Sequence, residues 1–215
     1  MLTDDLFASQ PQPAIQLQAQ AWLLPAFACS VDQQLWADIQ TVIAQAALRQ
    51  MQIPGGKTMS VAMTNCGDYG WVSDRSGYRY SATDPQTGSS WPAIPESLFD
   101  LAVSAAKAAG FDSFLPDACL INRYLTGCKM SLHQDKDEQD MTAPIVSVSL
   151  GIDAVFQLGG FTRTGPKLKV PLAHGDVLVW GGEDRLRYHG VLTVKQAQHP
   201  LVGGQRINLT FRKSN

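Results

Sequence analysis

The stretch from Asp117 to Arg212 is divided into short apolar segments by turns that contain glycine. Each segment is long enough for a strand and too short for a typical helix. The segments that we expect to form strands are Cys119–Tyr124, Ile145–Leu150, Ala154–Leu158, Leu168–Leu172, Val177–Trp180, Gly190–Val194 and Arg206–Arg212. Many short strands at such spacing are typical of a sandwich or barrel, and we predict a double-stranded β-helix, or jelly roll, over residues 115–215.

Two segments before this region have the pattern of amphipathic helices. Residues 31–49 repeat apolar side chains at helical spacing, and the preceding Ser30–Gln33 run has the form of a capping box. A second helical pattern, residues 96–109, follows Pro95 and stops at Gly110. We expect both helices to buttress the jelly roll, so the fold class is α+β and mainly β.

The segment between the two helices, residues 51–92, is rich in glycine, serine, threonine and aromatic residues. This composition predicts short strands and long loops that display aromatic side chains, as in a lid or recognition surface. We therefore divide the single folded unit into an N-terminal segment 1–30, helices and lid 31–114, and the core 115–215.

Composition restricts the class of protein further. The 17 Lys and Arg residues against 19 Asp and Glu residues give a formal net charge of -2, which excludes a global positive field toward nucleic acid or acidic membranes. The first ten residues lack the basic start and apolar run of a signal peptide, and no apolar stretch could span a bilayer. The four cysteines form no CxxC pair, so we expect reduced thiols. We expect a cytoplasmic protein without membrane contact.

The strongest local signal for chemistry is the His133-Gln134-Asp135 motif. In an extended segment, residues i and i+2 point to the same face and can bind one metal ion together. His189, at the head of a predicted strand, could return to this pair across a sheet. Two histidines and one carboxylate on one face form the triad of non-haem Fe(II) oxygenases, which leaves coordination positions open for substrate and O2. The alternative is that the motif lies in a surface turn.

The closing segment Arg206–Arg212 alternates strictly between apolar and polar side chains. Arg206, Asn208, Thr210 and Arg212 share one face, which could simply be the solvent side of a strand. The two arginines also suit a dicarboxylate ligand, because each guanidinium can bind a carboxylate through two charge-assisted hydrogen bonds. A second predicted strand places Asn122 and Tyr124 on one face, and these would add an amide and a phenol to the same pocket.

Together these motifs resemble the Fe(II)/2-oxoglutarate dioxygenases, and the wider runs look like the bacterial AlkB alkylation-repair demethylases. The matching runs include Pro54–Gly56, Met59–Gly67, Asn122–Tyr124, Ser131–Glu138, Pro144–Gly151, His174–Asp176, Trp180–Gly182 and Arg206–Arg212. The resemblance covers most of the chain, whereas the first 30 residues match poorly.

The resemblance implies a role for each matching residue of the core. His133, Asp135 and His189 would hold Fe(II) and form the catalytic centre, with 2-oxoglutarate and O2 as cosubstrates. The residues implied to bind 2-oxoglutarate are Asn122 and Arg212 near the keto-acid end, and Tyr124, Arg206 and Asn208 at the distal carboxylate.

The resemblance also implies a substrate, namely a flipped N-methylated base such as 1-methyladenine or 3-methylcytosine. Trp71 would stack on the base, Asp137 would face its exocyclic amine, Tyr78 and Arg163 would contact phosphates, and Met63 would line the base pocket. From the residues alone, Trp71 and Met63 fit partial core equally well, and Asp137 and Arg163 fit solvated surface charges.

The implied activity is oxidative demethylation of DNA, or of RNA, with release of formaldehyde and conversion of 2-oxoglutarate and O2 to succinate and CO2. Methylated single- or double-stranded DNA would be the partner of a monomeric repair enzyme. The alternatives are a 2-oxoglutarate-dependent hydroxylase or demethylase that acts on RNA, protein or a small molecule, and a jelly-roll binding protein without catalysis. A complete set of three iron ligands and two arginines argues against the last.

Overall fold

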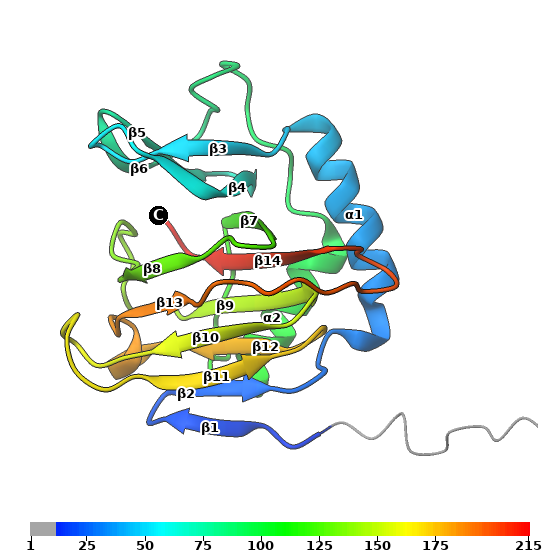
Figure 1. Cartoon of the computed structure of the whole chain (residues 1–215), viewed down its shortest axis with the longest axis vertical. Coiled ribbons are helices and arrows are strands. Elements are labelled where there is room, and N and C mark those ends of the chain that lie inside the picture. Colours follow the sequence, from blue (N-terminus) through cyan, green and yellow to red (C-terminus); the bar gives the residue numbers. More distant parts are fainter. Residues whose placement is uncertain (1–11) are drawn as a thin grey trace, which may run out of the picture.

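The computed structural model describes residues 12–215 and consists of two facing β-sheets, a separate hairpin and two helices (Figure 1). The first ten residues, which bear on the expected absence of a signal peptide, lie outside this part of the chain. Within residues 12–215, no helix is long and apolar enough to cross a membrane. The larger sheet consists, in spatial order, of β1 (Ile15–Gln18), β2 (Ala21–Leu24), β12 (Val177–Trp180), β9 (Ile145–Gly151), β14 (Gln205–Arg212), β7 (Ala118–Leu125), β4 (Thr58–Gly67) and β3 (Arg49–Gln52).

The smaller sheet and the hairpin complete the β-structure. The smaller sheet has the order β11 (Leu168–Leu172), β10 (Ala154–Leu158), β13 (His189–Val191) and β8 (Met130–His133), and the hairpin pairs β5 (Gly70–Asp74) with β6 (Gly77–Ser81). All strand pairings are antiparallel among the described residues. This arrangement confirms the predicted fold class, a mainly β protein with a jelly-roll core.

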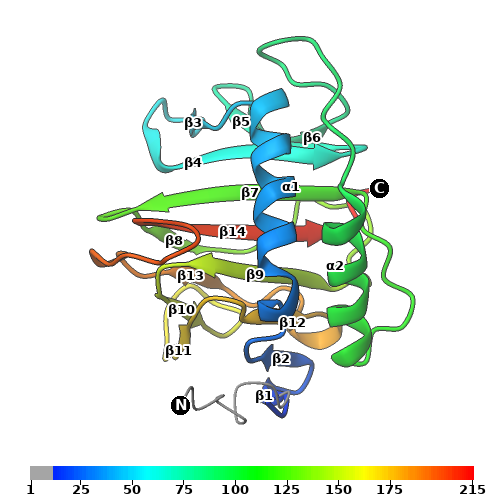
Figure 2. The ribbon, with the colours of Figure 1, turned by 90° about the vertical axis from the view of Figure 1, so that its right-hand side faces the viewer.

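Two helices cover the outer face of the larger sheet. Helices α1 (Asp32–Gln45) and α2 (Glu96–Ala108) lie side by side across its strands (Figure 2). Their buried side chains, such as Leu35 and Leu98, share one core with the apolar face of β14, where Ile207 and its alternate neighbours are fully buried. The helices therefore support the sheet from the side that faces away from the smaller sheet.

A second core fills the space between the two sheets. It contains Leu120 and Trp180 from the larger sheet and Phe156 and Val191 from the smaller sheet. Every residue of β9 is buried because helices cover one of its faces and the smaller sheet covers the other. The polar face of β14 points into this inner layer, and the prediction that it could face solvent is wrong, since Arg206 is 1% exposed.

Several predicted boundaries needed correction. Helix α1 ends at Gln45 instead of 49, because the chain then turns into the edge strand β3. Ser30 makes no capping bond, since a short 3-10 helix (Cys29–Val31) precedes α1 and places Val31 at the cap position. The strand predicted over Gly190–Val194 instead covers His189–Val191.

The lid segment also differs from the prediction of short strands and loops. Its ten-residue strand β4 is an integral part of the larger sheet and pairs with β7. Strand β2, from the segment 1–30 that we set apart in the sequence, pairs with β12 in the same sheet. Strands from both sides of residue 115 share one sheet. We therefore propose that the chain is a single folded unit and that the division at residue 115 separates parts with different roles.

Candidate active site

The strand pairing of the smaller sheet brings the three predicted metal ligands together. Residues His133 of β8 and His189 of β13 are direct partners in the antiparallel register, and Asp135 follows two residues after His133. Gly190 allows this close approach, because a side-chain carbon there would lie 2.7 Å from the backbone oxygen of Met130. The ligand atoms of the three residues lie within 4.8 Å of one another.

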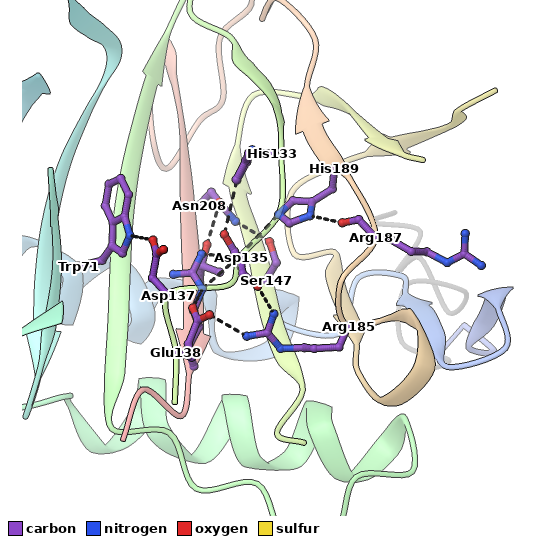
Figure 3. Close-up of polar contacts among 12 residues, drawn as sticks. Trp71, His133, Asp135, Asp137, Glu138, Ser147, Arg185, Arg187, His189 and Asn208 are labelled. Carbon is purple, nitrogen blue, oxygen red and sulfur yellow. Dashed lines mark hydrogen bonds and ion pairs between the residues drawn. The ribbon is translucent and has the colours of Figure 1, made fainter. Parts of the chain in front are cut away.

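Hydrogen bonds fix the orientation of both imidazoles. Nδ1 of His133 lies 2.8 Å from the carbonyl oxygen of Ser131. Nδ1 of His189 lies 3.0 Å from the carbonyl oxygen of Arg187, a contact that Figure 3 shows. A carbonyl can only accept, so each Nδ1 carries the proton and each Nε2 keeps a lone pair. The two Nε2 atoms lie 3.6 Å from the two oxygens of Asp135. This donor set matches the 2-His-1-carboxylate arrangement that suits non-haem Fe(II).

The ionisation states also favour metal binding. Burial and the nearby His189 imidazole lower the pKa of His133 to about 4, so its imidazole is neutral near pH 7. Burial alone would raise the pKa of Asp135, but Arg212 and the two histidines outweigh it and hold that pKa well below its usual range. Arg212 binds Asp135 Oδ2 through Nε at 3.0 Å and Nη2 at 2.6 Å. Arg212 thus contacts a ligand carboxylate directly.

A small pocket, with a cavity volume of about 50 Å³, opens next to the triad, between the two sheets. Its lining includes all five residues predicted to bind 2-oxoglutarate, namely Asn122, Tyr124, Arg206, Asn208 and Arg212. The guanidinium of Arg206 donates to Ser149 Oγ at 2.8 Å, whereas its Nε and Nη1 are buried without a partner, as is Oδ1 of Asn122. Buried donors such as the two Arg206 nitrogens are costly unless a ligand pairs with them. The pocket therefore fits an anionic ligand such as a carboxylate.

Asn208 differs from Arg206 in that its polar atoms are already occupied. Its Nδ2 donates to Ser147 Oγ at 2.8 Å and to the carbonyl oxygen of Val148 at 3.0 Å, and its Oδ1 accepts from Thr210. As the chain lies in the structure, Asn208 supports the pocket wall. Its predicted contact with 2-oxoglutarate would require this pairing to change.

Three of the predicted substrate residues contact one another. Trp71, on hairpin strand β5, stacks on Tyr78 of β6 with a centroid distance of 5.6 Å, and Tyr78 is 47% exposed. The indole Nε1 of Trp71 donates to Asp137 Oδ2 at 2.9 Å (Figure 3). Trp71 itself is partly buried against the core between the sheets, so the structure groups one exposed and one partly buried aromatic ring with a carboxylate from the segment that follows Asp135.

The other two predicted substrate residues lie elsewhere. Met63 is 1% exposed and packs in the core between the sheets, so it has no free surface for the predicted contact with a base. Arg163 is exposed on the loop between β10 and β11, with its guanidinium 5.6 Å from the centroid of the Tyr188 ring. Met63 was predicted from a motif in β4, whose inward-facing positions are filled by core side chains.

Sequence reasoning missed a buried network beside the triad. Glu138 lies 3.2 Å from Nε of Arg212 and 3.1 Å from Nη2 of Arg185, and it accepts a hydrogen bond of 2.7 Å from the hydroxyl of Tyr80. Glu138 stands in the same acidic run as Asp135, which was the available signal. Arg185 precedes β13 in a loop without periodic pattern, and nothing local indicates its partner.

Comparisons with known proteins agree with this geometry. A family model of the 2OG-Fe(II) oxygenase superfamily matches residues 20–212. The alpha-ketoglutarate-dependent dioxygenase AlkB of Escherichia coli strain K12 is 55% identical over 210 residues, which cover 98% of this chain and 97% of that protein.

More distant relatives share the core. A protein of Arabidopsis thaliana named DNA N(6)-methyladenine demethylase ALKBH1C is 32% identical over 69% of this chain and 38% of its own length. The solved structure of OsALKBH1 superposes with a TM-score of 0.82 at 29% identity and covers 94% of this chain and 100% of that chain. The chain therefore belongs to the AlkB family within the 2OG-Fe(II) oxygenase superfamily, as a dioxygenase that uses Fe(II), 2-oxoglutarate and O2.

Proposed function

We propose that this protein removes methyl groups oxidatively from N-methylated nucleic-acid bases, as part of the repair of alkylated DNA. The observation that carries the proposal is the His133, Asp135 and His189 triad, whose Nε2 and carboxylate atoms converge at the mouth of a pocket with unpaired buried donors. In this proposal the triad holds Fe(II). The relatives named above are a dioxygenase and a DNA demethylase, which supports a nucleic-acid substrate.

The pocket residues would position the cosubstrate. Arg206 would bind the distal carboxylate of 2-oxoglutarate through its two unpaired nitrogens, beside the Tyr124 ring that lies 5.0 Å from its guanidinium carbon. Asn122 and Arg212 would lie near the keto-acid end. The reaction converts 2-oxoglutarate and O2 to succinate and CO2 and hydroxylates the methyl group, after which the base is restored as formaldehyde leaves.

The hairpin would recognise the base. Stacking on Trp71 suits a flipped base, and a ring that carries positive charge, such as 1-methyladenine or 3-methylcytosine, is attracted to aromatic faces and carboxylates. Asp137, held by Trp71, would then favour a cationic lesion over a neutral base. Tyr78 and Arg163 are exposed and could contact phosphates of DNA, or of RNA, on either side of the lesion.

The oligomeric state, cellular location and strand preference of the enzyme follow from the same proposal. We propose that it acts as a monomer in the cytoplasm, without a membrane partner, on single- or double-stranded substrates. The formal charge of -2 implies that strand binding depends on a few local cations and weakens as salt rises.

The decisive experiment incubates the protein with Fe(II), 2-oxoglutarate and oligonucleotides that carry a single 1-methyladenine or 3-methylcytosine. Mass spectrometry should show one formaldehyde for each methyl group lost, with more succinate than the protein forms without oligonucleotide. Asp135→Ala should abolish both products because it removes the charged ligand, whereas Asp153→Ala, at an exposed carboxylate outside the site, should not. If no base is demethylated and the oligonucleotides do not stimulate succinate formation, the proposal fails and the alternative is a hydroxylase that acts on protein or a small molecule.

A further inference from the structure

The hairpin that carries Trp71 is tied to the metal-ligand segment by two side-chain hydrogen bonds. Trp71 on β5 donates to Asp137, and Tyr80 on β6 donates to Glu138 at 2.7 Å. Both acceptors lie within three residues of Asp135 in the sequence. The recognition element and the carboxylate ligand are therefore connected through two separate contacts.

Glu138 is a buried carboxylate for which the proposed reaction has no use. Its side chain is 2% exposed, with one oxygen facing both the Tyr80 hydroxyl and Arg212, and the other facing Arg185. A buried charge is tolerated only when it is paired and hydrogen-bonded. The Tyr80 phenol remains a donor, because burial raises its pKa well above the usual value although Arg212 opposes this shift.

The two arginines connect Glu138 to Asp135. Arg212 spans Glu138 and Asp135 with one guanidinium, at 3.2 Å from the first and 2.6 Å from the second. Arg185 donates to the backbone oxygens of Asp135 at 2.7 Å and Ala143 at 3.1 Å. One oxygen of Glu138 thus faces the arginine that binds the Asp135 carboxylate, and the other faces Arg185, which binds the Asp135 main chain. Figure 3 shows Glu138, Arg185 and Asp135 together.

We propose that Tyr80 and Glu138 are positioning residues that couple the hairpin to the orientation of Asp135. A base that holds the hairpin in place would hold Glu138 through Tyr80, and Glu138 would hold Arg212 and the ligand carboxylate. Such coupling is reciprocal, so metal bound at the triad must also stabilise the hairpin. The inference rests on the proposed function only in taking Asp135 as a metal ligand.

The reciprocal effect can be measured without turnover. Amide hydrogen exchange of residues 70–81 is compared with and without Mn(II) and 2-oxoglutarate in wild type and Tyr80→Phe. Loading should slow exchange in wild type by about tenfold, the change that one hydrogen bond to a charged group supports, and Tyr80→Phe should lose most of this gain. Tyr69→Phe is the matched control, because its hydroxyl contacts Asn215 outside the network. An equal gain in Tyr80→Phe and wild type would overturn the inference.

A double-mutant cycle tests whether both residues act along one path. Glu138→Gln keeps the shape of the side chain and removes its charge, and it should weaken Mn(II) binding by about tenfold, as expected for a partner of a metal ligand. In that background Tyr80→Phe should add little, whereas independent and additive effects would refute the coupling. Calorimetry of Mn(II) binding to wild type and Asp135→Ala distinguishes failure of the proposed function from failure of this inference. If no metal binds at the triad, the proposed function fails. If metal binds there but the coupling is absent, only this inference fails.

Discussion

Arg206 stands out among the fully buried side chains because two of its guanidinium nitrogens have no partner. A pocket that keeps such a charge buried is adapted to an anionic ligand, since unpaired donors destabilise the fold until a carboxylate binds them. The Ser149 hydroxyl and the Tyr124 ring hold the guanidinium plane at a fixed orientation. Geometry as well as charge should therefore decide the affinity for 2-oxoglutarate.

Replacement of Arg206 by lysine tests this role. The ammonium keeps the charge but loses the planar pair of donors, so the concentration of 2-oxoglutarate required for half-maximal succinate formation should rise about tenfold or more. Arg163→Lys, at an exposed arginine outside the pocket, is the control and should leave this requirement unchanged. The assignment of the distal carboxylate to Arg206 would be wrong if both variants resembled wild type.

The low pKa of His133 predicts a pH effect on the stability of the metal-free protein. The folded protein holds this pKa at about 4, compared with about 6.5 in an unfolded chain. The unfolded chain therefore binds the proton more readily, so this contribution to stability is complete above about pH 6.5 and is lost as the pH falls toward 4. With a chelator present, the free energy of unfolding should fall less steeply over this interval in His133→Gln than in wild type. Parallel curves for the two proteins would contradict the shift.

The hairpin formed by β5 and β6 is the element through which the site meets its substrate. It forms a two-stranded sheet of its own, separate from the larger and the smaller sheet, and presents the Trp71 and Tyr78 rings beside Asp137. The loop that follows β6 is anchored by Arg49, which binds both oxygens of Asp84 at 2.6 Å. Changes at Tyr78, which is exposed, and at Trp71, which is only partly buried, should therefore affect substrate recognition before they affect the jelly roll.

Trp71→Ala should separate recognition from oxidation. Stacking contributes on the order of 1–3 kcal/mol per base, so repair of a methylated oligonucleotide should fall by about tenfold to a hundredfold. Formation of succinate without substrate should remain, because the indole nitrogen of Trp71 donates to Asp137, which is not one of the three triad residues. Both products are measured in one reaction. If they decline together, Trp71 supports the core and the hairpin is not the recognition element.

The elements that sequence predicted best are those with an unambiguous local pattern. The alternation in β14 placed four polar side chains on one face, and Pro95 and Gly110 marked the ends of α2. Strands β1 and β2 were missed because each is four residues long, and they join the sheet only through the pairing of β2 with β12. At the site, the spacing of His133 and Asp135 predicted a pair of metal ligands. The contact between Glu138 and Arg185 could not be predicted, because it forms only when distant loops meet.

At the scale of the whole molecule, the site joins parts of the chain that are far apart in sequence. The triad comes from β8, β13 and the segment between β8 and β9, while the pocket wall comes from β7, β9 and β14 of the other sheet. The larger sheet contains both β1, near the start of the described residues, and β14, near their end. The two sheets cannot separate without dismantling the site, so ligand binding must stabilise the entire fold.

Loading with Mn(II) and 2-oxoglutarate should therefore raise the temperature of a single unfolding transition. At 100 times its dissociation constant a ligand adds about 2.7 kcal/mol, and for a chain of this size each kcal/mol corresponds to about 2–4 °C, which gives a shift of about 5–10 °C. Circular dichroism and tryptophan fluorescence should report the same shift, because both follow one cooperative unit.

Asp135→Ala should lose most of the shift, since it lacks the charged ligand, while Asp153→Ala should retain it. A shift confined to one probe would show that the site lies on a part of the chain that unfolds independently, and an undiminished shift in Asp135→Ala would place the metal elsewhere.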